Sequence, residues 1–209
     1  MTAPPVPTPP DVQRSWADGA LTAAGAVLLA LAALPVDRTR VGAAETAVSR
    51  LVNELAVLPS WLARQLGDLL VVPATAVLAA ALHRWWLAAG ALVVGIGAHL
   101  SAKVVEGLVV RGRPDGLLSD VVVRGADAHG RGSVSGHAAV VRVGAAVALV
   151  AVAWPWLGTR GRLVCVALAL TVCLARVHVG AHLPLDVVGG AGPGLATAGC
   201  VRLLLGRPA

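Results

Sequence analysis

Long apolar stretches dominate this chain. Six of them approach or exceed the roughly 18–20 residues that cross a bilayer as a helix. They cover about residues 20–36, 66–82, 85–110, 135–154, 163–179 and 184–205. The pattern predicts an all-α fold, a polytopic membrane bundle of six transmembrane helices in which residues 16–209 form one domain. The proline-rich segment 1–15 is expected to be a disordered N-terminal tail.

A segment between the first two apolar stretches has a different pattern, with apolar residues on one side of a helix and polar residues on the other. The apolar positions are Ala44, Ala47, Val48, Leu51, Val52, Leu55 and Leu58, and the polar positions are Glu45, Ser49, Arg50, Asn53 and Glu54. This spacing predicts an amphipathic helix, which either lies along the membrane interface or packs on the bundle from the solvent side.

Composition supports a membrane protein and excludes other classes. The chain is 57% hydrophobic and 13% charged, whereas soluble domains carry about 25% charged residues. The net charge of +6 does not indicate nucleic-acid binding, because the arginines are scattered between apolar stretches and form no basic face. Cys165, Cys173 and Cys200 all lie within apolar stretches, so neither a disulfide framework nor a zinc site is expected.

Tryptophans mark one boundary of the predicted bundle. They are Trp16, Trp85, Trp86, Trp154 and Trp156, all at the ends of stretches opposite the loop 111–134. This placement indicates an aromatic belt but does not say which side of the membrane it faces. The arginines of the loop favour a cytoplasmic position by charge alone, although they carry no topology signal if they bind phosphate.

Polar residues gather at the other boundary. The loops after the third and fifth spans lie on the same side of the membrane, because two spans separate them. This arrangement brings together Arg111, Arg113, Ser135, Gly136, His137, Arg176, His182 and Asp186. Ionisable groups in membrane segments are costly, so these residues are candidates for a functional site.

Several of these residues are suited to holding an oxyanion. Arg113 and Arg176 supply forked donors that match tetrahedral oxyanions. Ser135 and Gly136 begin a predicted helix, where free backbone N–H groups and the helix dipole favour an anion.

The remaining residues are suited to nucleophilic and acid–base chemistry. His182 and Asp186 are four residues apart, and Pro184 fits the first turn of a helix, so the carboxylate can orient the imidazole. His137 is then a second imidazole that can donate a proton. Together the residues predict phosphoryl transfer through a phosphohistidine, with no metal or cofactor required.

Two motifs carry a resemblance to a known family. Ala175-Arg176, five residues, His182, three residues and Asp186 match a motif in which Ser-Arg precedes the histidine and aspartate at this spacing. Val134-Ser135-Gly136-His137 matches a second motif, Pro-Ser-Gly-His, with valine for proline. The chain thus resembles the type 2 phosphatidic acid phosphatases, integral-membrane lipid phosphatases related to bacterial acid phosphatases and vanadium haloperoxidases.

The resemblance implies a role for each matching residue. His182 would be the nucleophile, Asp186 would orient it, and His137 would protonate the leaving alkoxide. Arg113, Arg176, Ser135 and the Gly136 amide would hold the phosphoryl oxygens. The resemblance also implies a site on the extracytoplasmic face of the plasma membrane and a lipid phosphate substrate from the bilayer. Phosphatidic acid, phosphatidylglycerol phosphate and polyprenyl phosphates or diphosphates all remain open, as does the oligomeric state.

The first motif of that family, Lys, six residues, Arg-Pro, is altered here. Glu106 stands where the lysine is expected, and Lys103 lies three residues earlier, roughly 4.5 Å deeper along the helix. Lys103 either reaches the phosphate site along its flexible stem or stays out of it. In the second case, Arg142 is a candidate replacement, and it is also a candidate partner for a buried Glu106.

Other polar residues have simpler interpretations. His178 is expected to pack at the rim of the site, and His99 to be a hydrogen-bonded core histidine. Asp68 either faces the site or marks the membrane boundary.

Functions other than a phosphatase fit the sequence less well. A catalytically weakened member that binds lipid or assists assembly is supported by the displaced lysine, Val134 and Ala175. Vanadium-dependent halide oxidation is disfavoured by the membrane setting. A transporter is disfavoured because the polar groups gather at one end and line no path.

Overall fold

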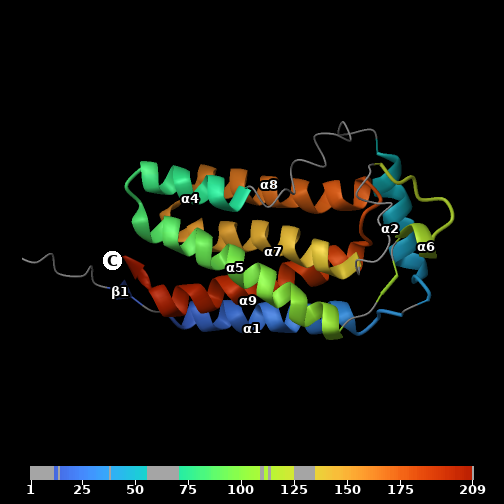
Figure 1. Ribbon diagram of the computed structural model, residues 1–209, viewed down its shortest axis with the longest axis horizontal. Helices are drawn as coiled ribbons and strands as arrows, with labels where there is room; N and C mark the ends of the chain where they lie inside the picture. The colour runs from blue at the N-terminus through green and yellow to red at the C-terminus, as the bar shows by residue number, and fades with distance from the viewer. Residues whose placement is uncertain are drawn as a thin grey trace, which may run out of the picture.

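A computed structural model of the chain describes residues 12–13, 15–37, 39–55, 71–108, 111–112, 114–124 and 135–208. The helices in these ranges are α1 (Trp16–Ala33), α2 (Ala43–Glu54), α4 (Val71–Ala81), α5 (Trp85–Leu108), α6 (Pro114–Leu117), α7 (Ser135–Ala153), α8 (Thr159–His178) and α9 (Pro184–Leu205). A 3₁₀ turn, η2 (Trp154–Trp156), follows α7. Most of the helices lie side by side as an elongated bundle (Figure 1). The predicted all-α class is therefore confirmed.

Short strands join the two ends of the described chain. β1 (Val12–Gln13) pairs antiparallel with β2 (Arg207–Pro208). Two residues within the predicted tail 1–15 thus contact the segment that follows α9. Ser15 then caps α1, because its hydroxyl accepts from the Ala17 N–H at 3.3 Å.

Four helices are long and apolar enough to cross a membrane, counting only the part of the chain that the structure describes. They are α1, residues Trp85–Val105 of α5, α8 and α9. Two shorter apolar helices, Val72–Ala81 and Arg142–Ala153, lie within α4 and α7. Residues 66–70, where the second predicted span begins, are outside the described residues. The helices are compatible with a membrane protein, and the count of six spans stays a prediction.

Helix α9 is the centre of the bundle and packs against both α1 and α7. Glycines bring the backbones together: a Cβ on Gly25 would overlap the Gly192 carbonyl, and a Cβ on Gly194 would overlap the Gly144 carbonyl. Apolar helices in membranes commonly pack through such small residues. The contacts also fix the register of α7 and α9, which run in the same direction (Figure 1).

One end of the bundle carries the tryptophans. Trp16, Trp85, Trp86 and Trp154 are all exposed there, as a belt at a membrane boundary would require. The buried ion pair between Asp18 of α1 and Arg202 of α9, with 2.7 Å between Oδ1 and Nη2, lies at this same end.

Helix α2 crosses the opposite end of the bundle, roughly perpendicular to the other helices (Figure 1). Its polar residues Glu45, Ser49 and Asn53 are buried, whereas Val48 and Leu51 are exposed, Leu51 at 63%. A helix that packs on a soluble bundle buries its apolar face. Here α2 is amphipathic as predicted, but it attaches to the bundle mainly through its polar stripe.

Candidate functional site

The turn between α8 and α9 forms the centre of the candidate site. Helix α8 ends in a Schellman motif: the Gly180 N–H donates to the Val177 carbonyl at 3.0 Å, and the Ala181 N–H donates to the Arg176 carbonyl at 3.2 Å. Gly180 has a φ of 71°, the left-handed conformation that favours glycine at this position. The motif reverses the chain within a few residues and leads it directly into α9.

This reversal brings Arg176 and His182 together. The His182 N–H donates to the Arg176 carbonyl at 3.3 Å. Both side chains are 3% exposed, so a guanidinium and an imidazole are enclosed at the end of the bundle. The sequence prediction that these two residues share a site is consistent with this geometry.

Asp186 begins α9 together with Pro184. Pro184 occupies the first helical position, where its missing N–H costs nothing, and Asp186 is two residues further. The Asp186 Oδ2 atom accepts from the Leu183 N–H at 3.0 Å, and Oδ1 faces the Arg111 Nη1 atom at 3.5 Å. These two contacts fix the position of the Asp186 carboxylate. The role of Asp186 in orienting the His182 imidazole stays a prediction.

Arg111 lies in this site, at the end of the bundle where the sequence placed it, but the sequence assigned it no role. It is 5% exposed and donates to both carboxylate oxygens of Glu45, at 2.9 Å from Nη1 to Oε1. Burial lowers the pKa of Arg111, but the hydrogen bond to Glu45 and the nearby charges of Asp186 and Glu45 raise it, and the net shift is upward. Arg111 therefore stays charged between two carboxylates.

A second set of contacts ties α2 to the turn after α8. The buried Asn53 side chain donates from Nδ2 to the Val122 and His178 carbonyls, both at 2.9 Å, and accepts from the Val122 N–H at 3.0 Å. Arg124 adds a bond from Nη1 to the His178 carbonyl at 2.7 Å. Val122 and Arg124 are thus bonded to α2 and to the last turn of α8.

His178 packs at the rim of the site, as predicted. Its imidazole is buried, and its Nδ1 atom lies 3.2 Å from the Val52 carbonyl of α2. The side chain is therefore engaged with α2 rather than directed toward a substrate.

The first turn of α7 lies at the level of the first turn of α9. Gly144 of α7 is opposite Gly190 and Gly194 of α9, and the two helices run in the same direction. With a rise of about 1.5 Å per residue, position 135 is level with position 183. The predicted anion-binding start of α7 is thus next to the turn that carries His182.

Several predicted site residues are not described to the level of their side chains. Arg113 lies outside the described residues, and only the backbone is described for Ser135, Gly136 and His137. The roles assigned to these four residues stay predictions. Asp68 also lies outside the described residues.

Lys103 is not part of the buried cluster. Its side chain is exposed on α5, next to the exposed Val104, whereas Val105 is buried. Positions two apart on a helix point about 160° away from each other, so Lys103 is directed away from the face that holds Val105. The alternative in which Lys103 enters the phosphate site is therefore not favoured by its placement.

His99 departs from its sequence prediction. A core position was expected, but the side chain is exposed, one turn before Lys103 on the same side of α5. The surrounding residues Ile96 and Leu100 are exposed as well, which is expected where a helix faces lipid. Arg142 is half-buried on α7, and the Glu106 side chain that it was expected to pair with lies outside the described residues.

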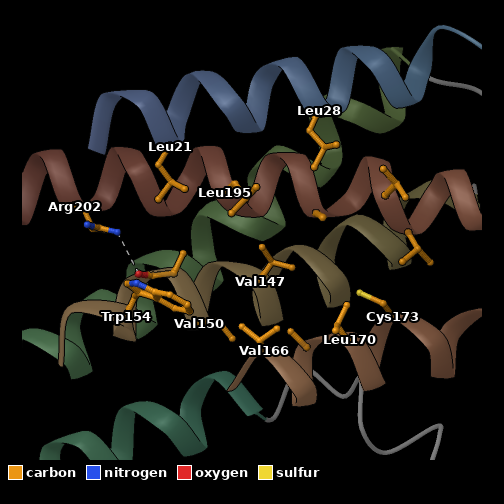
Figure 2. Close-up of a pocket in the computed structure, with 15 residues that line it drawn as sticks. Leu21, Leu28, Val147, Val150, Trp154, Val166, Leu170, Cys173, Leu195 and Arg202 are labelled. Atoms are coloured by element: carbon orange, nitrogen blue, oxygen red, sulfur yellow. Dashed lines mark hydrogen bonds between the residues drawn. The ribbon is translucent and has the colours of Figure 1, made fainter. Parts of the chain in front are cut away.

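An apolar cleft starts beside the site and runs along the bundle. It has a volume of about 630 Å³ and lies between α1, α7, α8 and α9 (Figure 2). Val187, which follows Asp186, and Cys173, one turn before Arg176, line it near the site. Trp154 and Arg202 line its other end. In the described part of the chain, no three His, Cys, Asp or Glu side chains lie close enough to hold a metal ion.

Comparison with known proteins supports the resemblance seen in the motifs. Residues 85–207, from α5 to the segment after α9, match the family model of the PAP2 superfamily. Neither the curated proteins nor the solved structures give a match. The matched range spans more than half of the chain and includes Arg176, His182 and Asp186, so the chain belongs to the PAP2 superfamily.

Proposed function

We propose that this protein is a membrane phosphatase that removes a phosphomonoester or a terminal pyrophosphate from a lipid. Members of the PAP2 superfamily are phosphatases that act on phosphate esters. The observation that carries the lipid assignment is the apolar cleft that begins at Val187 and Cys173, beside His182 and Arg176. A lipid phosphate matches both environments, because its phosphate suits the polar turn and its hydrocarbon chain suits the apolar cleft.

The proposed chemistry uses His182 as the nucleophile. The Nδ1 atom of His182 is shielded from solvent, so we assign the attack on phosphorus to Nε2. The new N–P bond forms as the bond from phosphorus to the leaving oxygen breaks, and His137 gives that oxygen its proton. Water then attacks phosphorus and gives a proton to His137 as the N–P bond breaks, which releases phosphate and restores both imidazoles.

Positive charge around the phosphoryl group would stabilise this transfer. Arg113 and Arg176, with the amide at the start of α7, would hold the three oxygens while charge shifts between attacking and leaving groups. Asp186 would stabilise the imidazolium and fix its orientation. No metal or cofactor takes part in this proposal.

The cleft supports a substrate with a long hydrocarbon chain. From Val187 to Arg202 it follows α9 for a distance of roughly 22 Å, and the side chains that line it are apolar apart from Arg202. A chain that enters this cleft from the bilayer exchanges one apolar environment for another, so the cleft favours it through its length and van der Waals contacts. Phosphatidic acid, phosphatidylglycerol phosphate and polyprenyl phosphates or diphosphates all carry such chains.

We also propose that α2 lies at the membrane interface, with the site on the extracytoplasmic face of the plasma membrane. The exposed residues Val48 and Leu51 of α2, and Leu55 directly after it, face away from the bundle, and the helix crosses the bundle end (Figure 1). An apolar outer face on such a helix fits the boundary between headgroups and acyl chains. A substrate entering from the bilayer would pass this boundary to reach His182.

Phosphate release from purified protein in detergent tests the proposed function. The panel contains phosphatidic acid, phosphatidylglycerol phosphate and polyprenyl phosphates and diphosphates, with His182→Ala assayed beside the parent protein. We expect release from at least one lipid, a loss of about 10³-fold or more in the variant, and inhibition by vanadate. Equal release by the variant and the parent would refute the assignment of His182.

A catalytically weakened lipid-binding protein is the second candidate. The outward placement of Lys103 favours it, because the first family motif then supplies no lysine to the site. Binding of lipid phosphates without phosphate release from any member of the panel would support this candidate over the phosphatase.

A further inference from the structure

The inward face of α2 carries three buried polar residues at helical spacing. Glu45, Ser49 and Asn53 are each separated by four residues, so they form a single stripe, and all three are buried. Asn53 bonds to the backbone at Val122 and His178. The stripe therefore attaches α2 to the site at one end through Asn53 and at the other end through Glu45.

Glu45 makes contact with two parts of the site at once. Its Oε1 atom accepts from the Leu185 N–H at 2.9 Å and from Arg111 Nη1 at 2.9 Å. Leu185 is in the first turn of α9, where backbone N–H groups have no partner within the helix. A carboxylate at this position satisfies one of them and interacts favourably with the helix dipole.

Arg111 continues the contact from Glu45 to Asp186. Its guanidinium is bonded to both oxygens of Glu45, and its Nη1 atom is 3.5 Å from Asp186 Oδ1. All three side chains are at most 7% exposed. Because these donors are already engaged by carboxylates, Arg111 is placed to hold Asp186 rather than to bind phosphate.

We propose that Glu45 is a positioning residue of the phosphatase site. Through Arg111 it holds the Asp186 carboxylate, and through the Leu185 N–H it holds the first turn of α9, which follows His182 directly. This inference rests on the proposed function, in which His182 and Asp186 act together. It gives α2, which lies outside the matched family range 85–207, a part in the site.

The negative charge of Glu45 is the property that this role requires. Glutamine has the size of glutamate and still accepts the Leu185 N–H, but it lacks the charge that holds Arg111 in place. Aspartate keeps the charge on a side chain one methylene shorter. A role in packing alone would favour glutamine, whereas a role through Arg111 favours aspartate.

The test compares phosphate release by Glu45→Gln and Glu45→Asp with the parent protein in detergent. A displacement of a catalytic group by about 1 Å costs roughly 100-fold in rate, so we expect kcat of Glu45→Gln to fall by about 10- to 100-fold with KM nearly unchanged. Glu45→Asp should retain more activity than Glu45→Gln. The matched control is Arg50→Gln, which breaks the exposed ion pair from α2 to Asp120 and should have the activity of the parent.

A double variant keeps the test decisive if Glu45→Gln does not fold. Glu45→Gln with Arg111→Gln removes both charges of the buried pair, which is better tolerated than stranding one of them. If Glu45 acts through Arg111, this double variant loses no more activity than Arg111→Gln alone. A loss of activity in the double variant equal to the product of the losses in the two single variants would overturn the inference.

The outcomes separate this inference from the proposed function. Full activity in both Glu45 variants, with an active parent and an inactive His182→Ala, would overturn the positioning role and leave the phosphatase intact. Greater activity in Glu45→Gln than in Glu45→Asp would also overturn the role. No phosphate release by the parent from any lipid would overturn both.

Discussion

Asn53 and His178 lie 125 positions apart in the chain and are joined by a buried hydrogen bond, 2.9 Å from the Asn53 Nδ2 atom to the His178 carbonyl. The bond fixes α2 to the last turn of α8, four residues before His182. The same Asn53 side chain also makes two bonds to the backbone of Val122. One amide thus connects three segments that surround the candidate site.

Replacing Asn53 with alanine should destabilise the protein. The substitution leaves the Val122 and His178 backbone groups without these bonds in a buried place, so we expect the free energy of unfolding to fall by about 1–3 kcal/mol. Thermal unfolding in detergent measures the change. Glu54→Ala, at the exposed neighbouring position, serves as the control and should change the stability by less than about 0.5 kcal/mol. Equal effects at the two positions would contradict the role of Asn53.

Gly180→Ala should disturb the turn that carries the site. A Cβ at Gly180 would lie 2.8 Å from the Val122 carbonyl oxygen, and its φ of 71° is strained for alanine. The conformation alone costs about 1–2 kcal/mol, so we expect a lower Tm and a lower kcat. Gly19→Ala, in open space on α1, should instead stabilise the protein by about 0.5–1 kcal/mol. An unchanged Tm for Gly180→Ala would show that the turn tolerates a side chain.

The sequence alone predicts much of the bundle, because the features involved are local. Apolar stretches of spanning length indicate where α1, α5, α8 and α9 lie. Arg176, His182 and Asp186 likewise lie close together in the chain, from the last turn of α8 to the first turn of α9. The structure joins the backbones of Arg176 and His182 there, and the roles of the three side chains stay predictions.

The contacts of α2 could not be predicted in the same way. Glu45 and Arg111 are 66 positions apart, and a periodic pattern says nothing about which distant residues meet. The amphipathic pattern shows two faces but not which of them is buried. In a soluble protein the apolar face points inward, whereas in contact with lipid it can point outward. The exposed His99 was mispredicted as a core residue for a related reason: a polar residue within an apolar span was assumed to face the interior.

The ion pair at the tryptophan end should contribute to stability. Asp18 is fully buried and lies 2.7 Å from the largely enclosed Arg202 guanidinium, so Arg202→Gln alone leaves a buried carboxylate and should cost about 3–5 kcal/mol. The double variant, Asp18→Asn with Arg202→Gln, should recover most of this loss. Thermal unfolding of the single and double variants measures the coupling, and simply additive losses would contradict a direct pair.

A larger side chain in the apolar cleft should impair long-chain substrates and spare short-chain ones. Leu170 lines the cleft on α8, so Leu170→Trp should raise KM for a long-chain lipid phosphate and leave KM for a short-chain, water-soluble phosphate unchanged. We expect a rise of only a few-fold, because a chain excluded from the cleft loses van der Waals contacts but stays in apolar surroundings. Leu168→Trp, at an exposed position of the same helix, is the control. The same rise in KM for both substrates would show that the chain does not occupy the cleft.

Trapping of a phosphorylated intermediate tests the central claim most directly. The protein is mixed briefly with a lipid phosphate that carries radioactive phosphorus, denatured in alkali, and examined for label bound to the chain. We predict a label that survives alkali, is released by acid as expected of a phosphohistidine, and is absent from His182→Ala. A label of equal amount in His182→Ala, or phosphate release by the parent protein with no labelled intermediate under rapid quenching, would contradict the account.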